Sequence, residues 1–459
     1  MVNNNLLFRN LTEKIANTDF SGYTIQYPPL FTWGERFCDK FILKKWSDSL
    51  RRYPDHLGLY VHIPYCKQKC SYCRYFSIEL QKNEEIDTYL YLLEREFSFY
   101  QKIFERFRFS SLYIGGGTPS LLTVKQLEKL FNILGRYFNI SHCKQIIIEG
   151  NPDFLDREKL ILLKKKGVNR LTIGVQTLDP AVINAVNRYQ TPNAFFRCFE
   201  EAKNAGIKDI NVDLMVGLPG QDERSVVDTV KKVVSLRPEM VHVHPFYPTK
   251  LTSFITKGES FSENSMQMRD NLCDIAHSLI DSNGYKNIRF DAKGRNETSR
   301  NIQLSDAIEY NSSFLGVGSG AVSHARNSLR YVNNSNLNKY ALALNKSKLP
   351  ISLSCNLTKK DEMVYFLTAC LRYGYVDKGK FKKMFNKDLE IVFSRQLRYL
   401  EKMGKISNKK RRLFSLMNNM GEYSIYSKYF YDSTLIRNYK NNSYHPSRIK
   451  SYDFRSVYL

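Results

Sequence analysis

Three cysteines within eight residues have the types and spacing best suited to chemistry in this sequence. Cys66, Cys70 and Cys73 are separated by three and two residues and follow an apolar run, so one short loop can turn all three thiolates inward. A [4Fe–4S] cluster is ordinarily held by four thiolates. With only three, one iron is left open for an exogenous ligand, like the open position of a catalytic zinc site. The spacing therefore predicts a cluster that acts on a bound small molecule.

A structural zinc site is the alternative interpretation of this motif. Zinc needs a fourth Cys or His ligand; Tyr75, Phe76 and Ser77 offer none, whereas His62 lies just upstream and can serve. The remaining cysteines are scattered, which is unlike a disulfide framework and fits packed thiols in a reducing cytoplasm. They are Cys38, Cys143, Cys198, Cys273, Cys355 and Cys370.

The elements around the motif alternate between buried strands and amphipathic helices. Short continuous apolar runs are typical of strands covered on both faces, and six of them begin at Gly58, Ser111, Gln145, Arg170, Asp209 and Met240. Between them, apolar residues recur at helical spacing in the segments Ile86–Phe104, Thr123–Phe138, Arg157–Lys166, Ala194–Ala205 and Asp222–Leu236. The alternation predicts an α/β fold with a partial (βα)6 TIM-type barrel, whose chemistry lies at the carboxyl ends of the strands.

The chain divides by composition into five parts. Residues 1–57 form an N-terminal extension, 58–250 form the barrel, and 251–350 mix polar loops with a glycine-rich stretch that we expect to complete the barrel and the substrate region. Residues 351–432 are mostly helical with a basic turn at Lys409–Arg412, an order that resembles a winged-helix module. Residues 433–459 form a basic, aromatic tail.

The charge of the chain is strongly positive, with 69 Lys and Arg against 45 acidic residues and a net charge of +24. Such a charge favours anionic partners, although the basic residues are spread along the whole chain as on an ordinary solvated surface. No apolar run approaches the roughly 18 residues that span a bilayer, and no secretory signal opens the chain. We therefore expect a cytoplasmic protein without a membrane span.

The sequence segments around and after the cysteines resemble one protein family. The matching segments run in order from Tyr60 to about Pro248: YVHIPYCKQKCSYCRYFS, LYIGGGTPS, IIEGNP, RLTIGVQTLDPAVINAVNRYQ and INVDLMVGLPGQ. They are similar to the oxygen-independent coproporphyrinogen III oxidase group of the radical S-adenosylmethionine (SAM) superfamily. That group also contains heme chaperones and radical SAM methyltransferases. A weaker similarity continues through FLGVGSGAVSHA, from Phe314, into the C-terminal helical part.

The resemblance implies a reaction. Cys66, Cys70 and Cys73 would hold the [4Fe–4S] cluster, and its open iron would bind SAM. An electron from a reduced flavodoxin- or ferredoxin-type donor would cleave SAM. The resulting 5′-deoxyadenosyl radical would take a hydrogen atom from a small-molecule substrate, with no catalytic residue beyond the cluster and SAM.

The resemblance also implies SAM contacts at matching positions, for one SAM molecule and a second one. Gly116, Gly117 and Thr118 form a turn after the second strand, where small residues let backbone N–H groups approach a ligand. Asp213 would bind the second SAM. The full set is Tyr60, Tyr72, Gly116, Gly117, Thr118, Glu149, Gln176, Arg188 and Asp213, with Tyr247 and Val322 as weaker matches.

Two departures from the family pattern leave the reaction open. Tyr75 stands where the decarboxylating oxidase has a fourth cysteine, two residues after the third. The heme chaperones also lack that cysteine, but they usually begin just before the cluster, whereas 57 residues precede Gly58 here. The segment DPAVINAVNRYQ is more similar in sequence to the oxidase.

Three hypotheses about function remain. The first is an enzyme of porphyrin or heme metabolism that acts on a tetrapyrrole, a polycarboxylate that Lys and Arg would bind well. The second is a radical SAM C-methyltransferase or methylene transferase acting on another metabolite. The third is a heme chaperone, for which His242 or His244 offers an axial imidazole. No nucleic-acid partner is expected, although the winged-helix-like part and the basic charge are compatible with one.

Overall fold

The structure is a computed structural model, and it describes residues 27–432 except 36, 249–251, 253–262, 290, 297–298, 418–421 and 424–425. The basic tail at 433–459 and the first part of the N-terminal extension lie outside the described residues. One thirteen-stranded sheet runs through the larger part of the molecule, and a three-stranded sheet lies in the C-terminal part.

Six parallel strands form the centre of the large sheet and stand side by side in chain order. Each begins within two residues of a predicted strand. Their interior positions are mostly buried, as expected for strands covered on both faces. The strands are β2 (Leu57–Ile63), β5 (Phe109–Gly116), β6 (Gln145–Gly150), β7 (Arg170–Gln176), β8 (Asp209–Val216) and β9 (Met240–Pro245).

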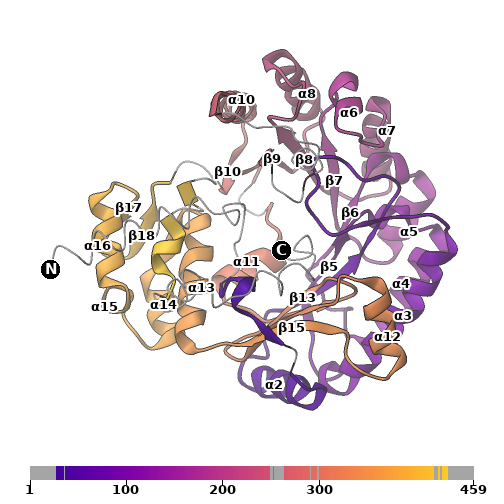
Figure 1. Ribbon diagram of the computed structural model, residues 1–459. Helices are drawn as coiled ribbons and strands as arrows, with labels where there is room; N and C mark the ends of the chain where they lie inside the picture. The colour runs from indigo at the N-terminus through magenta and orange to yellow at the C-terminus, as the bar shows by residue number, and fades with distance from the viewer. Residues whose placement is uncertain are drawn as a thin grey trace.

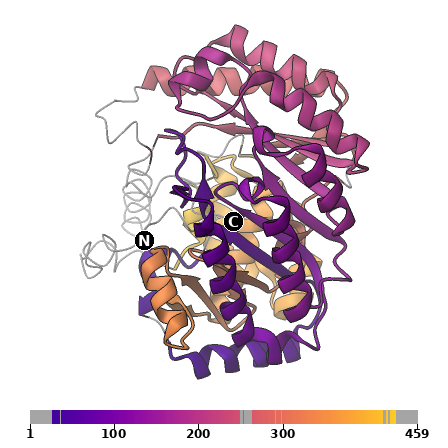
Figure 2. The same ribbon diagram turned by 90° about the vertical axis from the view of Figure 1, so that its right-hand side faces the viewer.

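Helices of the βα units cover the outer face of these strands (Figures 1 and 2). The α4 helix shows why they form: Thr123 and Gln126 make a reciprocal capping box at its start, and Leu127, Leu130 and Leu134 are buried on one face. The predicted partial barrel is therefore confirmed. The covering helices are α3 (Glu84–Phe104), α4 (Val124–Tyr137), α5 (Arg157–Lys165), α7 (Pro192–Asn204) and α8 (Glu223–Ser235).

The sheet extends beyond the barrel strands at both ends. Next to β2 lies the parallel strand β12 (Phe314–Val317), followed by the antiparallel strands β13 (Val322–Ala325), β14 (Leu329–Asn333), β15 (Ile351–Asn356) and β1 (Gly34–Glu35). Next to β9 lie β11 (Ala292–Gly294) and β10 (Lys286–Arg289). The prediction for residues 251–350 named polar loops and a glycine-rich stretch but no strands, and it placed the residues of β1 in the N-terminal extension and those of β15 in the mostly helical C-terminal part. These strands have two to six residues, which is too few to show a clear alternation of apolar and polar residues in the sequence.

The smaller elements complete the barrel part. Helix α2 (Asp39–Arg52) packs on the extended sheet, where Trp46 Nε1 donates to Tyr331 Oη at 2.9 Å. The remaining elements of this part are β3 (Tyr65–Cys66), β4 (Ile78–Glu79), α6 (Pro180–Ala185), α10 (Glu263–Ser282), α11 (Ile302–Glu309), α12 (Leu337–Asn345) and the short 3-10 turns Leu30–Thr32, Pro119–Leu121 and Pro152–Phe154.

The C-terminal part has its own apolar core, formed by residues such as Val364, Leu367, Phe381 and Leu397. Its order is helix, strand, helix, two further helices and two strands. The prediction named helices followed by a basic turn at Lys409–Arg412, and this turn joins β17 and β18, which the prediction did not name. The elements are α13 (Lys359–Arg372), β16 (Tyr375–Asp377), α14 (Lys378–Phe385), α15 (Leu389–Val392), α16 (Ser394–Lys402), β17 (Ile406–Asn408), β18 (Arg412–Ser415) and the 3-10 turn Ser427–Phe430.

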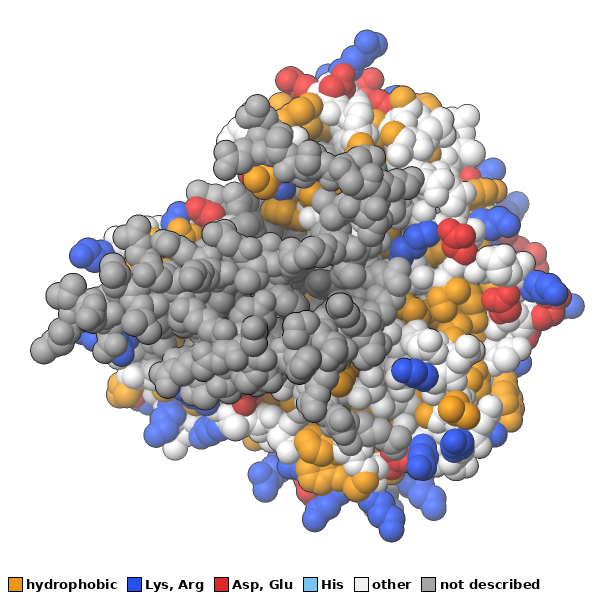
Figure 3. Space-filling view, viewed as in Figure 1, with side chains coloured by type: hydrophobic (Ala, Val, Ile, Leu, Met, Phe, Trp, Pro, Cys, Tyr) orange, Lys and Arg blue, Asp and Glu red, His pale blue; other side chains and the backbone are white. Residues whose placement is uncertain are grey.

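Basic side chains are dispersed over the surface. Figure 3 shows Lys and Arg around the rim of the visible face, with the densest group at the lower edge, where Figure 1 places α2. Across the part of the chain that the structure describes, no helix combines the length and the apolar character needed to cross a membrane.

Candidate active site

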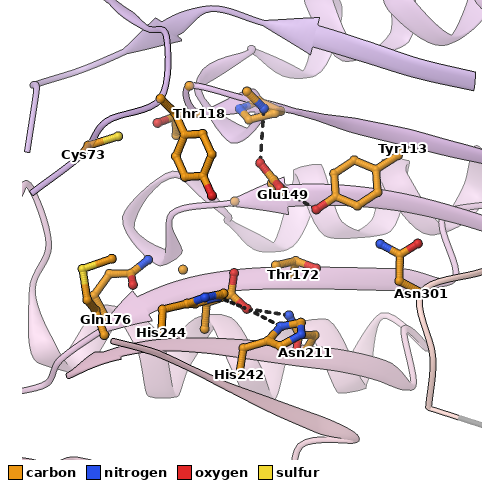
Figure 4. Close-up of a pocket in the computed structure, with 18 of the residues that line it drawn as sticks. Cys73, Tyr113, Thr118, Glu149, Thr172, Gln176, Asn211, His242, His244 and Asn301 are labelled. Carbon is orange, nitrogen blue, oxygen red and sulfur yellow. Dashed lines mark hydrogen bonds and ion pairs between the residues drawn. The ribbon is translucent and has the colours of Figure 1, made fainter. Parts of the chain in front are cut away.

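One cavity of about 410 Å³ lies among the carboxyl ends of the barrel strands. A volume of this size falls in the range of small-molecule sites, roughly 300–1,000 Å³. All of the predicted cluster and SAM residues line it, including the weaker matches. They are Tyr60, Cys66, Cys70, Tyr72, Cys73, Gly116, Gly117, Thr118, Glu149, Gln176, Arg188, Asp213, Tyr247 and Val322. Figure 4 shows side chains from several strands pointing into this one space.

Hydrogen-bond donors from the glycine turn and from the cysteine loop itself lie beside two of the cysteine sulfur atoms. Thr118 Oγ1 lies 3.4 Å from Cys66 Sγ, and Lys69 Nζ lies 3.8 Å from Cys73 Sγ. The Lys69 ammonium is held in place because it also donates to the carbonyl oxygen of Tyr75 at 2.5 Å. Burial raises the pKa of the Cys66 thiol to about 11. A metal would therefore be needed to keep that sulfur as a thiolate at neutral pH.

Arg188 supplies a second positive charge beside the loop. Its Nη1 lies 3.9 Å from Cys70 Sγ and donates to Tyr72 Oη at 2.6 Å. Its other nitrogens donate to Gln190 Oε1, at 2.8 Å, and to the carbonyl oxygen of Gly174. Three free thiols with cations beside two of them form a donor set that fits an anionic iron–sulfur cluster.

His62 does not offer the fourth ligand that a zinc site would need. Its Nε2 lies 3.3 Å from the carbonyl oxygen of Phe76, which can only accept, so the proton is on Nε2. Its Nδ1 then accepts from Tyr60 Oη at 2.9 Å. Burial lowers the pKa of His62 to about 4, so the ring stays neutral. Both nitrogens are engaged, which argues against zinc held by three cysteines and His62.

The glycine turn lies against the cysteine loop more closely than predicted. The N–H groups of Gly117 and Thr118 donate to the carbonyl oxygens of Ile63, at 2.8 Å, and Tyr65, at 2.7 Å. A Cβ on Gly117 would lie 2.6 Å from the Tyr65 oxygen. The expectation that these N–H groups face a ligand is therefore wrong: they join the turn to β2 and the loop, and the missing side chains permit that close packing.

Glu149 carries a partly buried carboxyl group at the end of β6. Tyr113 Oη donates to Oε1 at 2.5 Å, and the Gly116 N–H donates to Oε2 at 3.2 Å. Burial raises the pKa of Glu149 to about 7, against the opposing effect of these hydrogen bonds. A cation placed beside it would restore the ionised form, so the position suits a ligand that carries an ammonium group.

Asp213 on β8 is the second acidic group of the cavity. Its Oδ1 accepts from Asn211 Nδ2 at 2.7 Å and from His242 Nδ1 at 3.0 Å. Burial alone would raise the pKa of Asp213, but the hydrogen bonds from the histidines hold it well below its usual range. His244 Nε2 lies 3.9 Å from the same oxygen. The carboxylate is therefore ionised, and its Oδ1 is already occupied.

Alternate residues of β7, β8 and β9 face the cavity. Gln176 Oε1 and Asn211 Oδ1 are buried and have no hydrogen-bond partner among the described residues, which suits a ligand that brings donors. Most of these residues were not among those that the family resemblance implied. Every second side chain of a strand lies on the same face, so this alternation could have identified them. The lining positions are Arg170, Thr172, Gly174 and Gln176, then Asn211, Asp213 and Met215, then Met240, His242 and His244.

A wall of arginine and tyrosine side chains closes the cavity on the side of the extended sheet and α13. Arg330 on β14 is 1% exposed, lies 3.9 Å from the ring centre of Tyr365, and has an Nη2 with no hydrogen-bond partner among the described residues. No motif pointed to this wall, because its members come from segments that lie far apart in the sequence. They are Arg289, Arg300, Arg330, Tyr365, Arg372 and Tyr373.

Comparisons with known proteins agree with this arrangement. The model of the radical SAM superfamily matches residues 60–233. The heme chaperone HemW of Bacillus subtilis is 28% identical over 363 residues, which cover 77% of this chain and 94% of the relative. The oxygen-independent coproporphyrinogen III oxidase of Salmonella typhimurium is 30% identical over 324 residues, which cover 67% of this chain and 70% of the relative.

A solved structure extends the likeness to the fold. Coproporphyrinogen III oxidase from Escherichia coli matches with a TM-score of 0.78 at 24% identity, over 89% of this chain and 96% of that one. The superfamily implies a [4Fe–4S] cluster and SAM as cofactors. This chain belongs to the radical SAM superfamily, in its group of oxygen-independent coproporphyrinogen III oxidases and HemW heme chaperones.

Proposed function

We propose that this protein is a radical SAM enzyme that acts on a carboxylate-bearing substrate, a tetrapyrrole of porphyrin or heme metabolism. The observation that carries the proposal is the single cavity that joins the three cysteines, the polar strand ends and the arginine wall. When bound, the cluster and SAM supply a radical that removes a hydrogen atom from the substrate. The electron would come from a reduced flavodoxin- or ferredoxin-type protein.

Different residues of the cavity would bind the cluster and SAM. Cys66, Cys70 and Cys73 would hold the cluster, with Lys69 and Arg188 beside its sulfurs balancing negative charge. In the neighbouring part of the cavity, Glu149 would bind the ammonium group of SAM. Its pKa near 7 means that an ammonium partner is what would keep it ionised.

A second SAM molecule would lie toward β7 and β8. Asp213, Gln176 and Asn211 offer acceptor oxygens there for ribose hydroxyl or amine donors. Arg188 makes four described hydrogen bonds, which leaves one of its five N–H groups for a carboxylate. A second SAM suits both an oxidase and a methyl-transferring enzyme, so the radical C-methyltransferase remains an alternative.

The substrate would be anchored by the arginine wall. Arg330 is buried and has a guanidinium nitrogen without a hydrogen-bond partner among the described residues, which is costly unless a ligand supplies an acceptor. A carboxylate matches the guanidinium fork. The aromatic rings of Tyr365 and Tyr373 lie along the same wall and suit a flat substrate body.

A heme chaperone is the second candidate, favoured by the 94% coverage of the Bacillus subtilis relative and by Tyr75 at the position of the oxidase cysteine. His242 is a poor axial ligand, because Asp213 and Arg289 occupy both of its ring nitrogens. His244, which is partly exposed in the cavity, remains available.

The test is anaerobic incubation of the reconstituted chain with SAM, a reductant and coproporphyrinogen III. Release of 5′-deoxyadenosine that depends on the tetrapyrrole supports the enzyme, and mass spectrometry of the product identifies the reaction. Stoichiometric heme binding that is lost in His244→Ala, together with no substrate-dependent release, would instead assign the chaperone function.

A further inference from the structure

A chain of buried and partly buried polar side chains joins the Asp213 end of the cavity to helix α13. Asp213 Oδ1 lies 3.0 Å from His242 Nδ1, and His242 Nε2 lies 3.0 Å from Arg289 Nη2. Arg289 Nε donates to Asp291 Oδ1, and Asp291 Oδ2 lies 3.3 Å from Arg372 Nη2 at the end of α13. The chain therefore links a cavity carboxylate to the C-terminal part of the molecule.

The order of donors in this chain determines where His242 carries its proton. A guanidinium group only donates, so the nitrogen that faces Arg289 must accept. Burial lowers the pKa of His242 to about 4, so the ring is neutral and has one N–H group. That N–H is on Nδ1 and donates to Asp213. Arg289 is itself fixed by Asp291, which Arg372 holds from the other side.

The consequence for Asp213 is that its two oxygens differ. The described hydrogen bonds from His242 and Asn211 both go to Oδ1, and His244 also approaches that oxygen. Oδ2 is left for a ligand in the cavity that Asp213 lines. An ionised carboxylate with one oxygen held and one open is suited to a hydroxyl or ammonium donor.

A metal ion is the competing explanation for this cluster. Asp213, His242 and His244 offer ligand atoms within 4.8 Å of one another, a set of two histidines and one carboxylate. A metal on His242 Nδ1 would require the proton to move to Nε2, because metal-bound histidine donates its other N–H to an acceptor. Arg289 stands at that position and cannot accept. The arrangement therefore favours hydrogen bonding over metal binding.

We propose that His242 is a positioning residue, held with its proton on Nδ1 by Arg289, Asp291 and Arg372, and that it orients Asp213 toward the second SAM. The proposal rests on the proposed function for the role of Asp213. It makes the last turn of α13 part of the binding site, although α13 belongs to the C-terminal core.

Matched substitutions of His242 test the proposal on the full-length, reconstituted chain. Asn at position 242 places an amide N–H near the position of Nδ1, whereas Gln places it near Nε2. We expect His242→Phe and His242→Gln to weaken the binding of one SAM equivalent, measured by anaerobic calorimetry, about 10-fold to 100-fold. His242→Asn should stay within about threefold of the wild type. Wild-type binding in His242→Phe, or rescue by Gln and not by Asn, would overturn the proposal.

Two controls separate this proposal from the proposed function. If Asp213→Asn weakens SAM binding and His242→Phe does not, the positioning role fails and the function stands. If Asp213→Asn leaves SAM binding unchanged, the assignment of Asp213 itself fails. Iron content and circular dichroism equal to the wild type are required of each variant before it is compared.

A measurement on the wild type covers the case in which the variants do not fold. With histidine labelled in ¹⁵N, the nitrogen shifts of His242 should show a neutral ring protonated on Nδ1. Protonation on Nε2 would overturn the proposal. So would one equivalent of zinc that the dialysed wild-type chain retains and His244→Ala loses, because that result would assign the cluster to a metal.

Discussion

Glu96 should make the stability of this protein depend on pH in an unusual direction. The carboxyl group lies on α3, is fully buried, and accepts hydrogen bonds from the Gly318 N–H at 2.8 Å, from Asn333 Nδ2 at 2.7 Å and from Tyr340 Oη at 2.5 Å. These contacts hold the turn between β12 and β13 against α3. Burial raises the pKa of Glu96 from 4.5 to about 7 despite the three donors.

The sign follows from comparing the folded and unfolded states. Because the folded pKa of Glu96 is raised, the contribution of this group to stability is complete below pH 4.5 and is lost as the pH rises through about 7. The whole loss is about 3 kcal/mol, and the part between about pH 5 and about pH 7.5 is about 2 kcal/mol. Above that interval Glu96 adds no further pH dependence.

The assay compares the wild type with Glu96→Gln, because Gln cannot ionise. Other groups, among them Glu149 and His62, also have shifted pKa values and change the free energy of unfolding with pH. Subtracting the free energy of unfolding of Glu96→Gln from that of the wild type at each pH cancels their effect. Urea unfolding followed by tryptophan fluorescence is suitable, since Trp46 is buried in the same core. Relative to Glu96→Gln, the wild type should lose about 2 kcal/mol between about pH 5 and about pH 7.5. Parallel pH profiles of the two proteins would refute the reasoning.

Three further outcomes are expected from named contacts. Glu362→Leu should cost about 3–5 kcal/mol in urea unfolding, because His324, Asn311 and the Asn327 N–H all lose their acceptor in a buried region; an unchanged midpoint would contradict this. Arg330→Met should raise the KM for a carboxylate substrate about tenfold without loss of iron, and an equal rise for its methyl ester would rule out carboxylate recognition. Gly117→Val should lower the iron retained after reconstitution, because its Cβ would lie 2.6 Å from the Tyr65 oxygen; normal iron content would speak against this close packing.

The barrel could be predicted because its strands are apolar on both faces and its helices have one apolar face. The cavity residues Gly116, Glu149 and Gln176 could be placed because they lie at the ends of consecutive strands, and parallel strands bring their carboxyl ends to one edge. Asp213 was expected at a strand end but lies three residues before the end of β8, on the face that lines the cavity. Both signals are local in sequence. They required no knowledge of how distant segments pack.

The parts that sequence patterns did not predict depend on distant packing. Arg330 lies in a five-residue strand that joins the sheet through β13 and β15. Arg372 reaches the cavity only because α13 packs against the barrel, with Glu362 of the same helix paired to His324 of β13. The direction of the Gly117 N–H was also mispredicted, since it depends on how the glycine turn meets the cysteine loop.

The central claim is that Cys66, Cys70 and Cys73 hold a [4Fe–4S] cluster at which SAM is cleaved. The most direct test reconstitutes the wild type and a variant with all three cysteines replaced by Ala, without oxygen. Iron, sulfide and 5′-deoxyadenosine are then measured after addition of SAM and dithionite. The account predicts about four irons per wild-type chain together with SAM cleavage, and neither in the variant. A triple variant that keeps four irons and still cleaves SAM would contradict it.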